Sequence, residues 1–236
     1  MKYVSLPDEK VRCLSFYLAM EEYVARQLDE PECFFMWQVE PSVIFGRNQV
    51  VENEVNVAYC REHGIRMYRR KSGGGCVYAD WDNVMLSYVT AQDNVGFAFN
   101  SYINKVLLVL RKLGIAATGT RHNDVMIGDR KVSGTACYSV GGRSIIHATM
   151  LYDTNMEYML HAITPSQEKL QKKGVESVRQ RITLLKDHTT LTLEQFKAFV
   201  RSTLCVGERL LTPEEVAAIE RLEQSYLDAD FIKLID

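Results

Sequence analysis

Two short glycine-containing turns divide residues 124–152 into three segments of strand length, and this pattern limits the fold more than any other feature. Gly128-Asp129 separates Asp124–Ile127 from Arg130–Ser139, and Gly141-Gly142 separates that segment from Arg143–Tyr152. Two-residue loops of this kind join antiparallel neighbours, because glycine and aspartate accept the positive φ angles of tight hairpin turns. The sequence therefore predicts an antiparallel meander of three strands.

Helices and strands alternate through the rest of the chain. Apolar residues at helical spacing predict one helix from Asp8, its expected N-cap, to about Leu28, and another from Phe99 to Leu113, ended by Gly114. Three β-rich runs predict strands, at Cys33–Val39, Ser42–Phe45 and Val84–Thr90. Capping-box sequences that begin at Thr192 and Thr212 predict two short helices near the end. The expected fold class is α/β.

The composition fits one packed domain and argues against a broad nucleic-acid or membrane surface. The 236 residues are 47% hydrophobic, and 28 basic residues face 30 acidic ones, for a net charge of −2. The first eight residues lack an apolar signal core, and no uncharged apolar run approaches the roughly 18 residues of a membrane span. We therefore expect a single domain over residues 1–236, located in the cytoplasm, with no nucleic-acid or membrane partner.

The six cysteines stand singly, without a Cys-x-x-Cys pair or a histidine at metal-ligand spacing. Reduced thiols are therefore expected. Each is interpreted first as a small buried hydrophobic residue.

Cations run directly into three glycines in the stretch Arg69-Arg70-Lys71-Ser72-Gly73-Gly74-Gly75-Cys76-Val77-Tyr78. Consecutive glycines let the backbone approach a ligand and turn its N–H groups toward it, which suits a phosphate or adenylate. The stretch is neither a P-loop nor a dinucleotide-binding fingerprint, since it lacks both glycine patterns. A plain turn between two strands is the alternative.

A second polar cluster surrounds the first turn of the meander. If that turn is a two-residue hairpin, Ile127 faces Arg130, and Asp124, Lys131 and Ser133 share one face of the sheet. Asp124 would then hold Mg²⁺ beside a phosphate, while Lys131 neutralises charge at the phosphorus. A surface ion pair on a hairpin is the alternative. The same register, without a bulge, sets His147 opposite Ala136 on the other face, as a core or supporting residue.

Taken together, these clusters resemble the lipoate-protein ligase A family, within the biotin and lipoate ligase superfamily. The resemblance spans nearly the whole chain. Its blocks are Trp37-Gln38, Pro41–Gln49, Arg69–Asp80, Asn123-Asp124, Lys131–Gly134, His147-Ala148-Thr149, Lys173–Arg179 and Leu211–Glu215.

The resemblance implies a mixed, largely antiparallel sheet flanked by helices, and an enzyme that uses ATP and Mg²⁺ to convert lipoate into lipoyl-AMP. The lipoyl group would then pass to a lysine of a carrier, either a lipoyl domain of a 2-oxoacid dehydrogenase complex or the glycine cleavage H protein. Lys131 would be catalytic, with Trp37, His147 and Thr149 in support. ATP or lipoyl-AMP contacts would involve Arg70, Ser72, Gly73, Gly74, Gly75, Cys76, Val77, Tyr78, Asn123, Asp124 and Ser133.

The sequence departs from the family pattern in three places. Ala79-Asp80 stands where His-Asp is usual, Ala148 stands where glycine is usual, and Asp236 ends the sequence where two-domain members continue into an accessory domain. A form without that domain is expected, with a separate accessory subunit as one possible partner. Two alternative functions stay open: an octanoyl or lipoyl transferase acting through Cys76 or Cys137, and a non-catalytic module that binds lipoate or a carrier.

Overall fold

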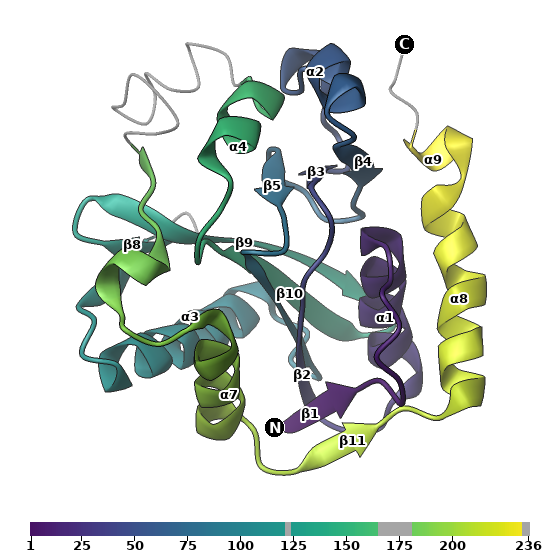
Figure 1. Cartoon of the computed structure of the whole chain (residues 1–236). Helices are drawn as coiled ribbons and strands as arrows, with labels where there is room; N and C mark the ends of the chain where they lie inside the picture. Colours follow the sequence, from purple (N-terminus) through teal and green to yellow (C-terminus); the bar gives the residue numbers. More distant parts are fainter. Residues whose placement is uncertain (121–123, 165–180, 233–236) are drawn as a thin grey trace.

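The structure, a computed structural model, describes residues 1–120, 124–164 and 181–232, and the strands of these residues form two sheets (Figure 1). The larger sheet has the order β11-β1-β2-β6-β10-β9-β8-β7. Its strands are β1 (Lys2–Ser5), β2 (Glu32–Trp37), β6 (Val84–Thr90), β7 (Ala117–Gly119), β8 (Asp124–Ile127), β9 (Arg130–Val140), β10 (Arg143–Met150) and β11 (Glu208–Leu210).

The predicted meander forms three adjacent strands of this sheet, next to the edge strand β7. Strands β8, β9 and β10 pair antiparallel in chain order, β10 pairs antiparallel with β6, and β6 pairs antiparallel with β2. Only the β11-β1-β2 end is parallel. The sheet is therefore mixed and largely antiparallel, as expected.

Helices cover both faces of the larger sheet (Figure 1). Helices α1 (Leu14–Gln27) and α8 (Pro213–Leu227) lie on one face, and α3 (Val95–Lys112) and α7 (Leu193–Leu204) lie on the other. Alternate residues of each strand supply the two cores, because successive side chains of a strand point to opposite faces. The α1 side receives Cys33, Phe35, Trp37, Met85, Val89 and Ile145, and the α3 side receives Phe34, Leu86, Tyr88, Ile146 and Met150.

A second, three-stranded sheet lies over the α1 side of the first. Its order is β4-β3-β5, formed by Arg66–Arg69, Ser42–Phe45 and Val77–Ala79. Ile44, Tyr68 and Ala79 of this sheet join the core beneath α1. Its other face packs against α2 (Val57–Glu62), α4 (Met156–Ala162) and the short 3-10 turn η1 (Val51–Asn53). A second 3-10 turn, η2 (Leu185–His188), contributes Leu185 to the core on the α3 side. The last helix, α9 (Ala229–Ile232), follows α8.

Most of the predicted helix signals are confirmed. Thr192 and Thr212 both form complete capping boxes, and Gly114 adopts a φ of 77° just after α3. The predicted N-cap at Asp8 is wrong, because α1 begins only at Leu14. The Asp8 carboxylate instead accepts hydrogen bonds from the Arg12 guanidinium at 2.6 and 2.9 Å.

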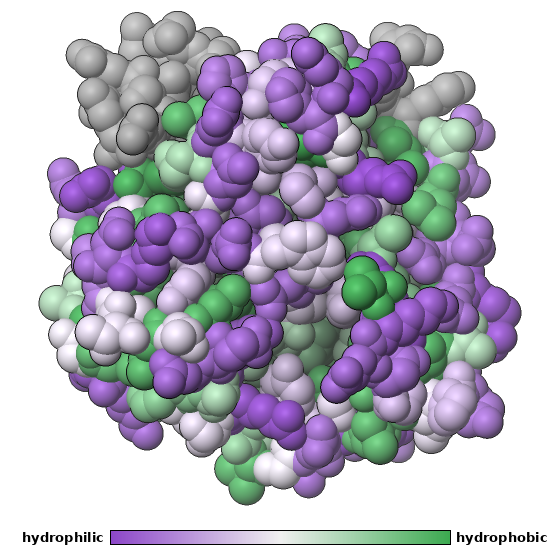
Figure 2. Space-filling model, viewed as in Figure 1, coloured by the Kyte–Doolittle hydropathy of each residue, from purple (hydrophilic) through white to green (hydrophobic). Residues whose placement is uncertain are grey.

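Polar side chains cover most of the face that Figure 2 shows, and apolar side chains form scattered groups between them. Among the described residues, no helix is both long enough and apolar enough to cross a membrane.

Candidate active site

One row of cross-strand partners runs over five strands on the α1 side of the larger sheet. Trp37 of β2 pairs with Met85 of β6, Met85 with Thr149 of β10, Thr149 with Gly134 of β9, and Gly134 with Asp124 of β8. All five residues line a cavity of about 650 Å³. Because neighbouring strands lie about 4.8 Å apart, the row is roughly 19 Å long. The cavity floor is therefore long enough for an extended ligand.

The two ends of this row differ in chemistry. Near β2 the cavity is lined by apolar side chains, those of Leu18, Trp37, Ile44, Val77 and Met85. Near β8 it is lined by charged side chains, those of Asp124, Lys131 and Arg181. A ligand with an apolar tail and an anionic head would match this arrangement.

The glycine segment, residues 70–76, crosses the end of β3 and forms one wall of the cavity. It connects β4 to β5, which pair with opposite edges of β3. The crossing is tight: Arg47 N donates to Ser72 O at 2.9 Å, and a side chain on Gly46 would overlap the carbonyl oxygen of Gly74. Gly74 also has a φ of 97°, a conformation that other residues rarely adopt. The crossing therefore requires glycine at position 46, beneath the segment, and at position 74 within it.

Arg70 holds the glycine segment from inside. Its Nη2 donates to the carbonyls of Gly73 and Gly75 at 2.7 and 2.8 Å, and its Nη1 donates to Ile44 O at 3.0 Å. Its Nε donates to Ser72 Oγ at 2.9 Å. Burial lowers the pKa of Arg70 to about 10, which leaves it charged at neutral pH. Arg70 lines the cavity, but most of its donors are used to shape the segment.

Two cations share one carboxylate at the charged end. Lys131 Nζ lies 2.7 Å from Asp124 Oδ1, and Arg181 Nη2 lies 2.7 Å from Asp124 Oδ2. Burial lowers the pKa of Lys131, the Asp124 carboxylate raises it in partial compensation, and Arg181 lowers it again. With two cations and one carboxylate, the three groups together present a net positive charge to the cavity.

A β-bulge changes which residues share a face with Lys131. Strand β8 pairs Met126 with Lys131 as expected, but the register then shifts, so that Asp124 pairs with Gly134 and Val125 pairs with Ser133. Ser133 is fully buried on the α3 side, beside Val125. The prediction that Ser133 shares the face of Asp124 and Lys131 is therefore wrong, because β9 carries one extra residue, Val132, between the two registers.

The same bulge brings His147 to the face of Lys131. His147 pairs with Ala136 as predicted, and Ala136 lies two residues from Gly134, whose added side chain would overlap Lys131 Nζ. His147 therefore lines the cavity rather than the opposite core. The sequence-based placement on the other face is wrong for the same physical reason as that of Ser133.

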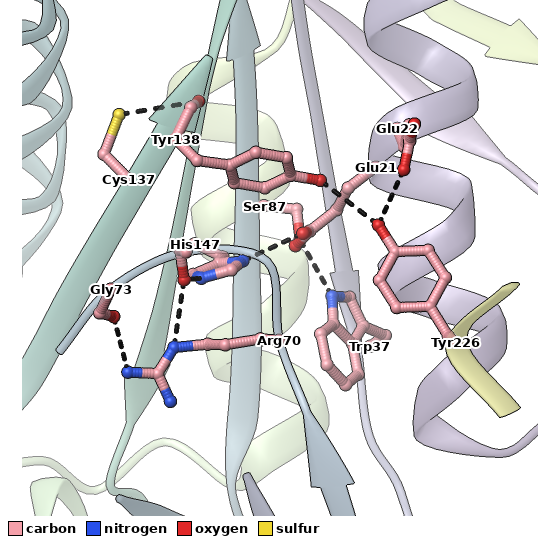
Figure 3. Close-up of polar contacts among 11 residues, drawn as sticks. Glu21, Glu22, Trp37, Arg70, Gly73, Ser87, Cys137, Tyr138, His147 and Tyr226 are labelled. Atoms are coloured by element: carbon pink, nitrogen blue, oxygen red, sulfur yellow. Dashed lines mark hydrogen bonds and ion pairs between the residues drawn. The ribbon is translucent and has the colours of Figure 1, made fainter. Parts of the chain in front are cut away.

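A buried polar network links α1, the sheet and the glycine segment (Figure 3). Glu21 Oε1 accepts from Ser87 Oγ at 2.5 Å, and Ser87 Oγ accepts from the indole Nε1 of Trp37 at 2.8 Å. Glu21 Oε2 lies 2.8 Å from His147 Nδ1, and His147 Nε2 lies 2.7 Å from Ser72 Oγ. Glu21, Ser72 and Ser87 are fully buried. Each oxygen of the Glu21 carboxylate therefore has a hydrogen-bond partner, Ser87 of β6 for one and His147 of β10 for the other.

The sequence model of the lipoyl protein ligase A/B catalytic domain matches residues 14–205, most of the chain. The chain belongs to this family. It is 34% identical over 230 residues to lipoate-protein ligase 1 of Staphylococcus aureus, covering 94% of this chain and 70% of that protein. It is 34% identical over 185 residues to the ligase LplJ of Bacillus subtilis, covering 77% of this chain and 56% of that protein. The chain thus spans little more than half the length of the second relative.

Solved ligase structures have the same fold. A bi-partite lipoate protein ligase from Thermoplasma acidophilum, solved in a study that includes its E2 lipoyl domain, superposes with a TM-score of 0.85 at 25% identity, covering 100% of this chain and 97% of that one. A lipoate-protein ligase A structure with bound ATP gives a TM-score of 0.82 at 22% identity, covering 99% of each chain. These similarities confirm the predicted catalytic-domain fold.

The family resemblance predicted binding residues that the fold brings together only in part. The cavity is lined by Trp37, Arg70, Gly74, Gly75, Cys76, Val77, Asp124, Lys131, His147 and Thr149. Ser72 of the glycine segment is fully buried and contacts His147, and Tyr78 is buried between the small sheet and helices α2 and α4. Gly73 gives its carbonyl to Arg70. Asn123 and the 173–179 block lie outside the described residues.

The Ala79-Asp80 departure from the family pattern has a structural account. Ala79 is fully buried in the core beneath α1. The Asp80 carboxylate accepts from Asn155 N at 2.9 Å and from Asp82 N at 3.1 Å, which fastens the β5–β6 turn to the N-cap of α4. Burial raises the pKa of Asp80. This pair therefore serves the fold around the cavity.

Two site residues escaped the sequence analysis. Glu21 lies in the apolar stripe of α1, since Leu14, Leu18 and Ala25 are its neighbours at helical spacing and all are buried. A carboxylate in such a stripe signals a buried polar partner. Arg181 carries no comparable signal, because its partner Asp124 is 57 residues away in the sequence.

Proposed function

We propose that this chain activates lipoate with ATP to form lipoyl-AMP and then passes the lipoyl group to a lysine of a carrier protein. The family, shared with curated lipoate-protein ligases, supports this reaction class. The observation that carries the proposal is the row from Trp37 to Asp124, because it joins an apolar floor to a cationic end beside the glycine segment.

The cavity offers a place for each part of the reactants. The hydrophobic lipoyl chain would lie over Trp37 and Met85, with its carboxylate toward Lys131. The nucleotide phosphates would meet the Lys131 ammonium and the backbone of Gly74 and Gly75. This orientation brings the carboxylate oxygen and the α-phosphorus together, which is the main contribution of a site to such a reaction.

The chemistry has two steps. A lipoate oxygen attacks the α-phosphorus of ATP, the bond to the β-phosphate oxygen breaks, and pyrophosphate leaves. The carrier amine then attacks the acyl carbon of the mixed anhydride, forms an amide and releases AMP. Lys131 stabilises the negative charge that develops on the phosphoryl oxygens in the first step and on the acyl oxygen in the second.

Mg²⁺ is proposed as a cofactor that accompanies ATP. Asp124 suits it in kind, since Mg²⁺ binds one or two carboxylates together with phosphate oxygens. Both Asp124 oxygens are engaged, by Lys131 and Arg181, and the described residues contain no cluster of three metal-binding side chains. When bound, the ion would supply charge neutralisation for the leaving pyrophosphate.

The proposed carriers are lipoyl domains of 2-oxoacid dehydrogenase complexes and the glycine cleavage H protein. A structural neighbour at 25% identity belongs to a bi-partite ligase studied with an E2 lipoyl domain, which supports a lipoyl domain as acceptor. By the same likeness, we propose that a separate accessory subunit assists the activation step.

One assay tests the proposal. Purified chain is mixed with ATP, Mg²⁺ and lipoate, and lipoyl-AMP and pyrophosphate are measured; a lipoyl domain is then added, and its mass is followed. We expect both products and an acceptor heavier by one lipoyl group, and we expect Lys131→Ala to lose both. If lipoate binds without turnover, with or without a candidate accessory subunit, the chain is a binding module and the proposal fails.

A further inference from the structure

Glu21 occupies an unusual position for a helical carboxylate. It is fully buried in α1, and its two oxygens serve opposite branches of one network (Figure 3). One branch runs through Ser87 to the indole of Trp37, and the other runs to His147. Burying a carboxylate costs free energy unless its oxygens accept hydrogen bonds, and both oxygens of Glu21 have partners.

The donors of the network can be assigned from one end to the other. The Trp37 indole can only donate, so Ser87 Oγ accepts from it and donates its own proton to Glu21. The carboxylate can only accept, so His147 carries a proton on Nδ1. Arg70 Nε can only donate to Ser72 Oγ, and Nε2 of a neutral imidazole that carries its proton on Nδ1 can only accept. For that form of His147, the Ser72 hydroxyl donates to Nε2.

We propose that Glu21 is a positioning residue, which holds the His147 proton on Nδ1 and thereby fixes both the glycine segment and Trp37 around the cavity. The His147 branch ends at Ser72 and Arg70, and Arg70 binds the carbonyls of Gly73 and Gly75. The Ser87 branch ends at the apolar part of the floor. The expected effect on kcat rests on the proposed ligase activity. The expected effects on the His147 proton and on the glycine segment do not depend on that activity.

The contacts of Ser72, His147 and Glu21 also have the connectivity of a serine hydrolase triad, with 2.7 and 2.8 Å between successive groups. Two observations argue against a nucleophilic Ser72. Its side chain is fully buried, and Arg70 Nε donates to the same oxygen that would have to attack. The triad-like geometry therefore serves to orient the wall of the cavity.

Glu21→Gln separates orientation from packing, because glutamine has nearly the same shape but carries an NH₂ donor group in place of one acceptor oxygen. Its carbonyl can keep the Ser87 hydrogen bond, and its NH₂ group then faces His147 Nδ1. The imidazole must move its proton to Nε2, and the hydrogen bond with Ser72 must reverse. Imidazole ¹⁵N NMR of the full chain measures this directly, and amide shifts of Gly73, Gly74 and Gly75 report the segment.

We expect the His147 proton on Nδ1 in the wild type and on Nε2 in Glu21→Gln, with shifted glycine amides. We also expect kcat for lipoyl-AMP formation to fall roughly 10- to 100-fold, the scale of a small misplacement of reacting groups. Glu223→Gln is the matched control, since Glu223 accepts from Ser15 at the α1–α8 contact, away from the cavity. It is expected to leave the imidazole, the glycine amides and kcat as in the wild type.

Ser72→Ala provides a second test if Glu21→Gln does not fold. It should leave the His147 proton on Nδ1 and still shift the glycine amides. The proposal would be overturned if the folded Glu21→Gln variant kept the His147 proton on Nδ1 and showed unchanged amide shifts for the glycines. Labelling of Ser72 by a fluorophosphonate would also overturn it, in favour of a nucleophilic serine. A wild type that makes no lipoyl-AMP refutes the ligase function alone, because the NMR outcomes do not depend on turnover.

Discussion

Lys131 Nζ lies 2.7 Å from Asp124 Oδ1, and the lysine reaches this position across the bare backbone of Gly134. A methyl group on Gly134 would overlap both the Nζ and the Cε of Lys131. Gly134 is therefore the residue that lets the proposed catalytic cation lie flat over β9. Its role is steric, since its backbone does not adopt a positive φ.

Gly134→Ala is accordingly expected to impair activity more than folding. The overlapped atoms are the far end of a flexible side chain, so Lys131 can move aside while the strand keeps its pairing. We expect lipoyl-AMP formation to fall by roughly tenfold or more, because the displaced cation no longer meets the phosphate. Pyrophosphate release measures the rate, and thermal unfolding measures the fold. Gly96→Ala in α3 is the control; an equal loss of rate there would contradict the steric account.

The pH dependence of the reaction follows from the environment of Lys131. Burial lowers the pKa of Lys131 below the usual 10.5, so its ammonium loses the proton at a lower pH than an exposed lysine. A step that needs the charged form should therefore slow as the pH rises, with a midpoint of kcat/KM below 10.5. A pyrophosphate assay across the alkaline range measures that midpoint.

Arg181 gives this prediction an internal check. Its positive charge lowers the pKa of Lys131, so Arg181→Met should move the alkaline midpoint of the residual activity to higher pH. A midpoint that stays in place, or moves to lower pH, would show that another group controls the alkaline limb.

The sequence could predict the location of this charged site but not its side-chain arrangement. The turn at Gly128-Asp129 fixes the pairing of Met126 with Lys131, and that pairing is confirmed. The bulge beyond it has no signature in the local sequence. A shift of one residue moves every later side chain to the opposite face, and this is why Ser133 and His147 were both misplaced.

The glycine segment shows the same limit. Its glycines and cations predict close backbone approach to a ligand, and this stays a prediction. The close approach that the structure shows is between Gly74 and Gly46. That Arg70 would bind the carbonyls of its own segment depends on β3 lying between β4 and β5. This strand order depends on pairing between residues far apart in the sequence, so it cannot be predicted from the local sequence of the glycine segment.

Arg70→Lys is predicted to destabilise the protein. A lysine ammonium lacks the planar fork that serves Ile44, Gly73 and Gly75, and unpaired carbonyls would remain buried. We expect the free energy of unfolding to fall by about 2–4 kcal/mol, as for the loss of buried hydrogen bonds with a charged donor. Urea denaturation measures the change, and limited proteolysis within residues 70–76 should accelerate. Arg61→Lys, on the exposed side of α2, should alter neither.

Cysteine variants distinguish the ligase from a thioester transferase. Cys137 packs on the α3 side of the sheet, opposite the cavity, and burial raises its pKa to about 12, so it is a protonated thiol at neutral pH. Cys137 therefore faces away from the cavity, because neighbouring residues of β9 face opposite sides of the sheet. Cys76 does line the cavity.

We expect Cys76→Ser and Cys137→Ser to remain ATP-dependent ligases, since neither thiol takes part in the proposed attack of a carboxylate on phosphorus. Mass spectrometry after incubation with an octanoyl carrier protein should find no acylated cysteine in the wild type. The result that would favour the transferase is an acyl group trapped on Cys76, together with loss of acyl transfer in Cys76→Ser. Because that reaction consumes no ATP, omitting the nucleotide separates the two mechanisms: the ligase stops, whereas a thioester transferase continues.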